Sequence, residues 1–267
     1  MKRIGVFFLC LVFLAAPVKA ADQPVWDLLS ESERALLTRI LAHWETWVPA
    51  RQQDGTAPLL TYEELYQGLD AEARDFLERV RHVDPKKDFG FTGDYLGESA
   101  EGVKIVRIDD QWVEKDGKPK KLDPQYLPEN VYKAYQDMAA AMQKDLGKKL
   151  LIESGYRSPA YQLYTFLFYT PKHGYSLSET GKWVAIPGYS EHGAPSHQAI
   201  DFINEKAVNG EDRVEDFEEL PEYAWLLKHA GDFGFMLSYP RNQPGITFEP
   251  WHWRYTASAQ AVQTENR

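Results

Sequence analysis

The sequence predicts an α+β protein that begins with a helical region. Two observations lead to this fold class. Over about residues 22–85, apolar residues recur at helical spacing behind capping signals. From about residue 101 onward, short stretches with strand character alternate with longer helical patterns. Short strands interspersed with helices are typical of the α+β class.

Capping signals mark the helices of the N-terminal region. Ser30 with Glu33, and Thr61 with Glu64, have the spacing of a capping box, and Asp70 can cap a further helix. Nothing in this region has the chemistry of a metal ligand or a catalytic group. Its role therefore stays open at this point.

The second part of the chain is predicted from changes of hydrophobic period and from glycine and proline punctuation. The predicted elements are a strand over 103–108, a hairpin turn at Asp116 and Gly117, a helix from Pro128 to Gly147, a strand over 150–153, a helix over 160–169, a long loop over 171–188, a strand over 199–203, an acidic linker over 205–219, a helix over 221–230 and a strand over 233–237.

Composition excludes some classes of partner. The formal net charge is −10, and no basic run is present. Such a chain has no electrostatic patch for nucleic acid or for anionic lipid, so neither is expected as a partner. Its eight Trp, fifteen Tyr and thirteen Phe residues favour a packed core and an aromatic-lined groove. The sequence makes no prediction of the oligomeric state.

Residues 1–20 have the pattern of a secretory signal peptide. A basic start precedes an apolar stretch over 4–16, and Val18 and Ala20 place small residues at the −3 and −1 positions. The apolar stretch is too short to cross a bilayer, so no membrane span is expected. We predict cleavage after Ala20 and a periplasmic location. The only cysteine, Cys10, would be removed with this segment.

Two stretches near the C-terminal end carry residue types that ligate metals. Residues 188–201 contain His192 and Asp201, and residues 249–255 contain Glu249 and His252. Two imidazoles and a carboxylate suit zinc and leave a coordination position for water. A further carboxylate can take the proton of that water. The set of residues predicts the chemistry of a zinc hydrolase.

The order of these motifs resembles that of the VanY-type D-alanyl-D-alanine carboxypeptidases, a zinc peptidase family related to the VanX dipeptidases. The resemblance covers roughly residues 125–256. That family has a small α+β domain, in which helices flank an antiparallel sheet and zinc lies in a groove over the sheet, so the same is expected here. The matching pieces are Ser154-Gly155-Tyr156-Arg157-Ser158, Pro187-Gly188-Tyr189-Ser190-Glu191-His192, Ala199-Ile200-Asp201, Phe233-Gly234-Phe235 and Glu249-Pro250-Trp251-His252.

The resemblance implies a role for each residue of the metal motifs. His192, Asp201 and His252 match the zinc ligands, and the implied cofactor is Zn²⁺. Glu249 matches the general base, which accepts a proton from water and delivers it to the leaving amine.

The resemblance also implies residues that hold the substrate. Arg157 matches the group that binds a carboxylate or carbonyl oxygen of the peptide and stabilises the tetrahedral intermediate. Ser190 and Gln162 match residues that help to position the peptide.

The spacing of the first motif departs from the family. His192 and Asp201 are nine residues apart, whereas seven is usual in the family, and His197 stands where a glycine is expected. Either His192 is the ligand and the loop bulges, or His197 replaces it. The Ser-Glu-His context favours His192.

The expected function is that of a zinc metallopeptidase, a D-alanyl-D-alanine carboxypeptidase that trims peptidoglycan stem peptides with metal-activated water. The alternatives are a peptidoglycan endopeptidase and an inactive zinc-containing module that binds the cell wall. Glu249 argues against the inactive module, because a binder needs no base. The predicted parts are a signal peptide (1–20), a helical region that docks to the wall, acts as a lid or packs (21–100), and a peptidase domain (101–260).

Overall fold

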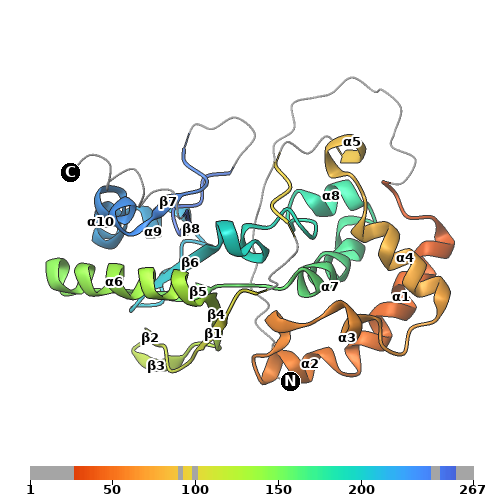
Figure 1. Cartoon of the computed structure of the whole chain (residues 1–267), viewed down its shortest axis with the longest axis horizontal. Coiled ribbons are helices and arrows are strands. Elements are labelled where there is room, and N and C mark those ends of the chain that lie inside the picture. The colour runs from red at the N-terminus through yellow and green to blue at the C-terminus, as the bar shows by residue number, and fades with distance from the viewer. Residues whose placement is uncertain (1–26, 90–92, 98–101, 242–246, 257–267) are drawn as a thin grey trace.

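The computed structural model describes residues 27–89, 93–97, 102–241 and 247–256 (Figure 1). The predicted signal peptide lies outside these residues. Within them, no helix combines the length and the apolar character that crossing a membrane requires.

The N-terminal helices begin where the capping signals predict. Ser30 and Thr61 each accept a hydrogen bond from the backbone N–H of the glutamate three residues later, whose side chain bonds back to the cap. Asp70 accepts from the N–H of Ala73. These helices are α1 (Glu31–Glu45), α2 (Val48–Gln53), α3 (Tyr62–Tyr66), α4 (Ala71–Arg81) and α5 (Pro85–Phe89), with the 3-10 helix η1 (Ala57–Leu59) between α2 and α3.

A four-stranded antiparallel sheet forms the centre of the C-terminal half, with the strand order β5-β6-β8-β7. The predicted α+β class is therefore confirmed. Asp201 pairs with Ser154 on one neighbouring strand and with His252 on the other. This register brings the two metal motifs together. The strands are β5 (Leu150–Ser154), β6 (Ala199–Asn204), β7 (Phe235–Leu237) and β8 (His252–Tyr255).

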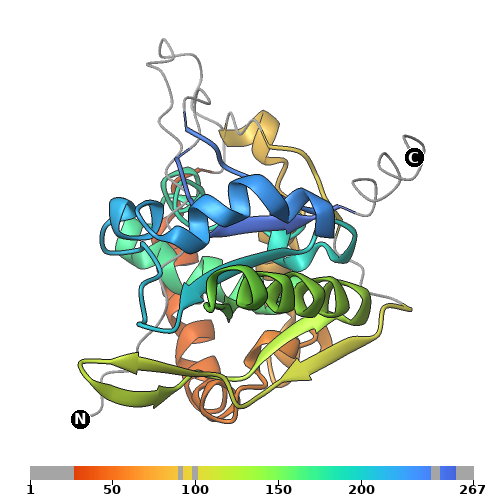
Figure 2. The ribbon, with the colours of Figure 1, turned by 90° about the vertical axis from the view of Figure 1, so that its left-hand side faces the viewer.

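Helices cover one face of this sheet. Ile200 and Phe202 share a buried cluster with Met138 of α6 (Glu129–Leu146) and Leu226 of α10 (Pro221–His229). Figure 2 shows both helices lying in front of the sheet. Because successive side chains of a strand point to opposite faces, Asp201 lies on the face away from these helices.

The boundaries of α6 follow from its sequence. Pro128 is its N-cap, and Gly147 ends it at a φ of 66°, a left-handed conformation that favours glycine.

The predicted turn at Asp116 and Gly117 joins strands β2 (Trp112–Lys115) and β3 (Lys118–Lys121). Both turn residues have positive φ, as a two-residue hairpin loop requires. The remaining strands, β1 (Ile105–Ile108) and β4 (Gln125–Pro128), pair with each other.

Two predictions of irregular structure are wrong. The expected loop 171–188 contains α8 (Leu177–Gly181) and the end of η2 (Thr170–His173), and the expected linker 205–219 contains α9 (Val214–Glu218). In α8 the cap Ser176 accepts from the N–H of Glu179. Helices this short have no room for apolar periodicity, so a capping signal is the main trace they leave in a sequence.

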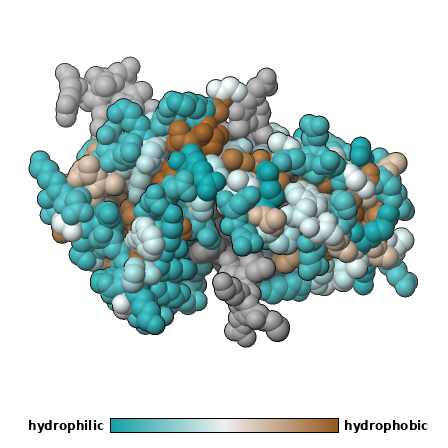
Figure 3. Space-filling view, turned by 90° about the horizontal axis from the view of Figure 1, so that it is seen from below, coloured by the Kyte–Doolittle hydropathy of each residue, from teal (hydrophilic) through white to brown (hydrophobic). Residues whose placement is uncertain are grey.

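The N-terminal helices share a hydrophobic core with α7 (Pro159–Tyr169) and α8. Trp44 packs against Tyr164 at 5.7 Å between ring centroids, and its indole N–H donates to the carbonyl of Leu65. The hydroxyl of Ser158, the N-cap of α7, donates to the carbonyl of Leu60 at 2.5 Å. The described surface in Figure 3 is mainly hydrophilic, in line with this burial. The proposed boundary at residue 100 stays a prediction.

Replacing Trp44 tests the coupling between the N-terminal helices and α7. Trp44 is fully buried in the shared core. We expect Trp44→Ala to lower the free energy of unfolding by about 3–5 kcal/mol, because it leaves a large cavity. Urea unfolding monitored by circular dichroism measures this change. The exposed neighbour Gln53→Ala is the control, and equal stability of the two variants would contradict the shared core.

Candidate metal centre

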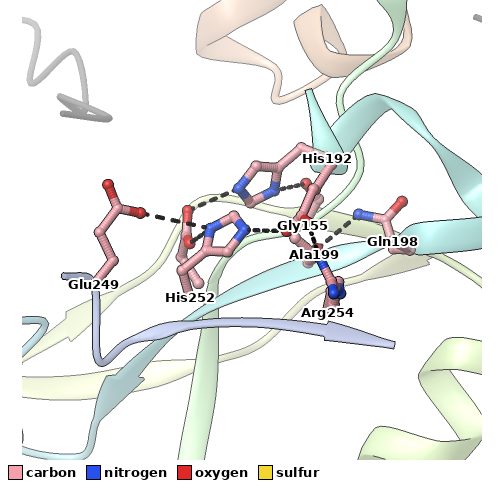
Figure 4. A network of polar contacts seen from close by, with 9 residues as sticks. Gly155, His192, Gln198, Ala199, Glu249, His252 and Arg254 are labelled. Carbon is pink, nitrogen blue, oxygen red and sulfur yellow. Dashed lines mark hydrogen bonds and ion pairs between the residues drawn. The ribbon is translucent and has the colours of Figure 1, made fainter. Parts of the chain in front are cut away.

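The structure brings His192, Asp201 and His252 into one buried group. Each offers a ligand atom, and these atoms all lie within 4.8 Å of one another (Figure 4). His192 comes from the loop before β6, Asp201 from β6 and His252 from the start of β8. Of the two histidines that the sequence left as alternatives, only His192 belongs to this group; His197 is exposed.

His192 presents one nitrogen to Asp201. Its Nδ1 lies 2.8 Å from the carbonyl oxygen of Gly155, which can only accept, so Nδ1 carries the hydrogen. Its Nε2 lies 3.1 Å from Oδ2 of Asp201 and makes no hydrogen bond of good geometry. Burial and the nearby charge of Arg157 lower the pKa of His192. The neutral ring therefore offers an Nε2 lone pair, which is the form that binds a metal.

His252 lies between two carboxylates. Its Nδ1 is 2.7 Å from Oδ1 of Asp201, and its Nε2 is 2.8 Å from Oε2 of Glu191. Burial alone would lower the pKa of His252, but the two carboxylates raise it to about 10. Nδ1 is the nitrogen that faces Asp201 and is therefore the one placed to ligate a metal.

Two consecutive 3-10 helices absorb the longer spacing between His192 and Asp201. They are η3 (Glu191–Gly193) and η4 (Pro195–His197). The N–H of His197 donates to the carbonyl of Ala194, and its ring contacts only the hydroxyl of Ser196 among the described hydrogen bonds. The segment between them thus forms a turn in which Ser196 and His197 are exposed, while His192 lies beside Asp201.

Glu249 has a buried carboxylate without a hydrogen-bond partner among the described residues. Its side chain is 1% exposed, and Oε2 lies 3.9 Å from Nδ1 of His252. The backbone N–H of His252 donates to the carbonyl of Glu249, which closes the turn that joins them. Burial raises the pKa of Glu249 to about 8, although the charge of His252 opposes this shift.

Arg157 approaches the same group from the end of β5. Its Nε and Nη2 atoms are shielded from solvent and have no hydrogen-bond partner among the described residues. Its backbone N–H donates to the carbonyl of His192 at 3.0 Å. Burial lowers the pKa of Arg157, while Asp201 is the strongest of the charges that oppose this shift. An orphaned guanidinium beside a metal group suits an anionic ligand.

The other two predicted substrate residues are buried. Ser190 is 5% exposed and directly precedes η3. Gln162 is 1% exposed, and its amide nitrogen donates to the carbonyl of Ala185. Their roles in substrate binding stay predictions.

Glu191 and Arg254 lie within the two stretches that carry the metal motifs, 188–201 and 249–255, but the sequence alone assigned them no role. The structure connects Glu191 to His252 and, through Oε1 at 2.8 Å, to Nη1 of Arg254. Burial would raise the pKa of Glu191, but the hydrogen bond and charge of His252, helped by Arg254, lower it to about 2. In the sequence these two residues are marked only by lying next to the ligand motifs. That position does not reveal a contact between residues 61 positions apart.

The donor set fits zinc. Two imidazole nitrogens and one carboxylate are ligands that zinc prefers, and three protein ligands are typical of catalytic zinc sites. The Nε2 atom of His192 is buried without a hydrogen-bond partner among the described residues, as a nitrogen reserved for a metal would be.

Comparison with known proteins agrees with the geometry. The profile of the VanY family, described as D-alanyl-D-alanine carboxypeptidase, matches residues 124–258. Because the match covers half of the chain, the protein belongs to this family. The matched part contains the whole metal group together with Arg157 and Glu249.

Individual relatives share about half of the chain. YodJ of Bacillus subtilis, named as a candidate carboxypeptidase, is 31% identical over 144 residues, which are 53% of this chain and 50% of that protein. The bifunctional D-Ala-D-Ala dipeptidase and carboxypeptidase VanXYC of Enterococcus gallinarum is 29% identical over 133 residues, 49% of this chain and 67% of that one. The solved structure of the LdcB LD-carboxypeptidase has a TM-score of 0.47 and 28% identity, and covers 64% of this chain and 75% of its own.

The two candidate histidines allow a matched test of the metal group. Losing a residue that only orients a ligand typically weakens metal binding about 10–100-fold. We expect His192→Ala to weaken zinc binding by more than this, because it removes a ligand itself. His197→Ala should leave zinc affinity unchanged, because that ring is exposed. Competition with a chromophoric chelator measures both affinities. The opposite ranking would assign the ligand to His197.

Glu153 is a further buried carboxylate near the metal group. It lies on β5 and is 7% exposed, and its Oε1 accepts a hydrogen bond from Nδ2 of Asn209 at 2.9 Å. Burial raises the pKa of Glu153 to about 7 in spite of this bond, and the charge of Asp201 adds to the shift.

A raised carboxyl pKa makes stability depend on pH in a defined direction. Between its unfolded value and about 7, the folded protein binds more protons at Glu153, so stability falls as pH rises through this window. We expect Glu153→Gln to reduce this fall. The free energy of unfolding should rise by up to about 3 kcal/mol above pH 7 and change little at pH 5. Urea unfolding at several pH values measures it. The exposed Glu45→Gln is the control, and identical pH profiles for the two variants would refute the expectation.

Proposed function

We propose that the protein is an exported zinc peptidase that removes the terminal D-alanine from peptidoglycan stem peptides. One observation carries the proposal: a buried His192, Asp201 and His252 group lies beside the carboxylate of Glu249, which accepts no hydrogen bond among the described residues. In a chain of the D-alanyl-D-alanine carboxypeptidase family, this arrangement supplies ligands and a base at one place. The chain spans half the length of its Bacillus relative, so the activity is argued from the site itself.

In this proposal His192 binds zinc through Nε2, His252 through Nδ1 and Asp201 through a carboxylate oxygen. When bound, zinc polarises the scissile carbonyl and lowers the pKa of the attacking water. The protein's own contribution is to hold the three ligand residues in place and to shield them from solvent, since each is at most 4% exposed.

Glu249 acts as the general base. Its buried carboxylate accepts a proton from the attacking water and passes it to the amine of the departing D-alanine. Its pKa, which burial raises to about 8, is close enough to neutral pH for the group both to take up a proton and to release it. No hydrogen bond among the described residues competes for its oxygens.

Arg157 holds the anionic end of the peptide. The two shielded nitrogens of its guanidinium can bind a carboxylate or a developing oxyanion, and a free C-terminal carboxylate is what distinguishes a carboxypeptidase substrate. Ser190 and Gln162 are proposed to position the peptide. The signal-peptide pattern of residues 1–20 supports export, and we propose a periplasmic location.

Replacing the base tests the activity. We expect Glu249→Gln to lower kcat on pentapeptide muropeptides by about 10²–10⁴-fold, because the amide cannot accept the proton. Zinc content should not change, since Glu249 is not one of the proposed ligands. Mass spectrometry of the products and metal analysis measure the two quantities, with the exposed Glu45→Gln as the control.

The substrates in this experiment separate the alternatives. Loss of one alanine from monomeric pentapeptides supports the carboxypeptidase. Conversion of cross-linked dimers to monomers would replace it by an endopeptidase. Zinc binding without cleavage of either substrate would replace it by a wall-binding module.

A further inference from the structure

We propose that Glu191, held by Arg254, is a positioning residue that selects Nδ1 of His252 as the nitrogen for the metal. The inference rests on the metal centre of the proposed function and adds two residues to it. Neither is among the ligands, the base or the substrate groups named above.

The contacts of His252 create the problem that Glu191 solves. The two ring nitrogens of a histidine are distinct, and the one that ligates a metal must lack a hydrogen. In this site each ring nitrogen faces a carboxylate, Asp201 at 2.7 Å and Glu191 at 2.8 Å. These two distances are nearly equal, so they do not decide which ring nitrogen carries the hydrogen. The site therefore needs a hydrogen-bond acceptor that keeps the hydrogen on Nε2.

Glu191 has the features required of such an acceptor. Its carboxylate is 7% exposed, and its two oxygens have different partners: Oε2 accepts from Nε2 of His252, and Oε1 accepts from Nη1 of Arg254 at 2.8 Å. The guanidinium fixes the orientation of the carboxylate and neutralises its charge. A fixed carboxylate that accepts from Nε2–H leaves the lone pair on Nδ1, and such partners also raise the basicity of the ligand.

Glu191 is not placed to serve as a ligand itself. The nitrogens of an imidazole point outward from different sides of the ring, and Asp201 and Glu249 lie near Nδ1 whereas Glu191 lies at Nε2. The group of donors within 4.8 Å accordingly contains His192, Asp201 and His252 and omits Glu191.

The positions of the two residues in the chain make the arrangement reciprocal. Glu191 directly precedes the ligand His192 in η3, and Arg254 follows the ligand His252 by two residues on β8. Residues two apart on a strand lie on the same face. Each segment therefore supplies one metal ligand together with one residue that orients a ligand, and the ion pair joins the two segments across the site.

The test measures metal binding and the tautomer of His252, both without substrate. We expect Glu191→Ala to weaken zinc binding about 10–100-fold. Glu191→Gln should recover part of this loss, because its amide oxygen can still accept from Nε2–H. Long-range ¹⁵N–¹H NMR of the zinc-loaded protein should show Nδ1 coordination of His252 in the unaltered chain and a mixture of ring forms in Glu191→Ala.

A surface variant provides the matched control. Glu218→Ala removes a partly exposed carboxylate that also pairs with an arginine, Arg241, and none of the described hydrogen bonds or ion pairs connects it to the metal ligands. It should leave zinc affinity and the His252 signals unchanged. If Glu191→Ala does not fold, Glu191→Gln and Arg254→Lys carry the same test in smaller steps.

The outcomes separate this inference from the proposed function. Zinc affinity and Nδ1 coordination that are equal in Glu191→Ala, Glu191→Gln and the control would overturn the role of Glu191 and leave the peptidase intact. Absence of zinc binding by the unaltered chain would overturn the metal centre itself, and the inference with it. Coordination through Nε2 in the unaltered chain would also refute the inference.

Discussion

The placement of Asp201 between two imidazoles is the interaction on which the rest of the site depends. A carboxylate that is 4% exposed is expensive to bury unless opposite charges or hydrogen bonds compensate it. His192 and His252 provide this compensation through contacts of 3.1 Å and 2.7 Å, and the two histidines lower the pKa of Asp201 although burial opposes the shift. The antiparallel register of β5, β6 and β8 decides which side chains stand beside Asp201. The register therefore determines whether the buried carboxylate is compensated.

The outer layer of the site extends the same rule of paired charges. Glu191 is compensated by His252 and Arg254, and the ring of His192 is held by a backbone carbonyl. Two groups break the rule: the carboxylate of Glu249 and the guanidinium of Arg157 lack hydrogen-bond partners among the described residues. Unsatisfied buried polar groups are costly, and their retention is typical of places where a ligand supplies the missing partner.

Much of this architecture could be predicted from the sequence, but not all of it. Local signals worked: the capping boxes at Ser30 and Thr61 and the left-handed glycine at Gly147 depend on neighbours a few residues away. The short helix α8 was missed because five residues are too few for periodicity. The contact between Glu191 and His252 was missed because it forms only when the tertiary fold brings η3 against β8.

The role of the N-terminal helices illustrates a second limit. Their helical character was evident, yet the sequence gives no indication of where their apolar faces would pack. In the structure Trp44 and Leu60 join the core built around α7, whose N-cap Ser158 follows Arg157 directly. Packing partners are decided by tertiary contacts, which hydrophobic patterns alone do not specify.

The hydrogen bonds between the Gly155–Arg157 turn and His192 have a consequence for substrate length. The carbonyl of Gly155 accepts from the ring of His192, and the N–H of Arg157 donates to its backbone carbonyl. His192 and Arg157 are thus joined by hydrogen bonds, which limit how far the two residues can move apart. If Arg157 binds the terminal carboxylate as proposed, a peptide whose carboxylate lies one residue further from the scissile bond is not expected to fit this distance.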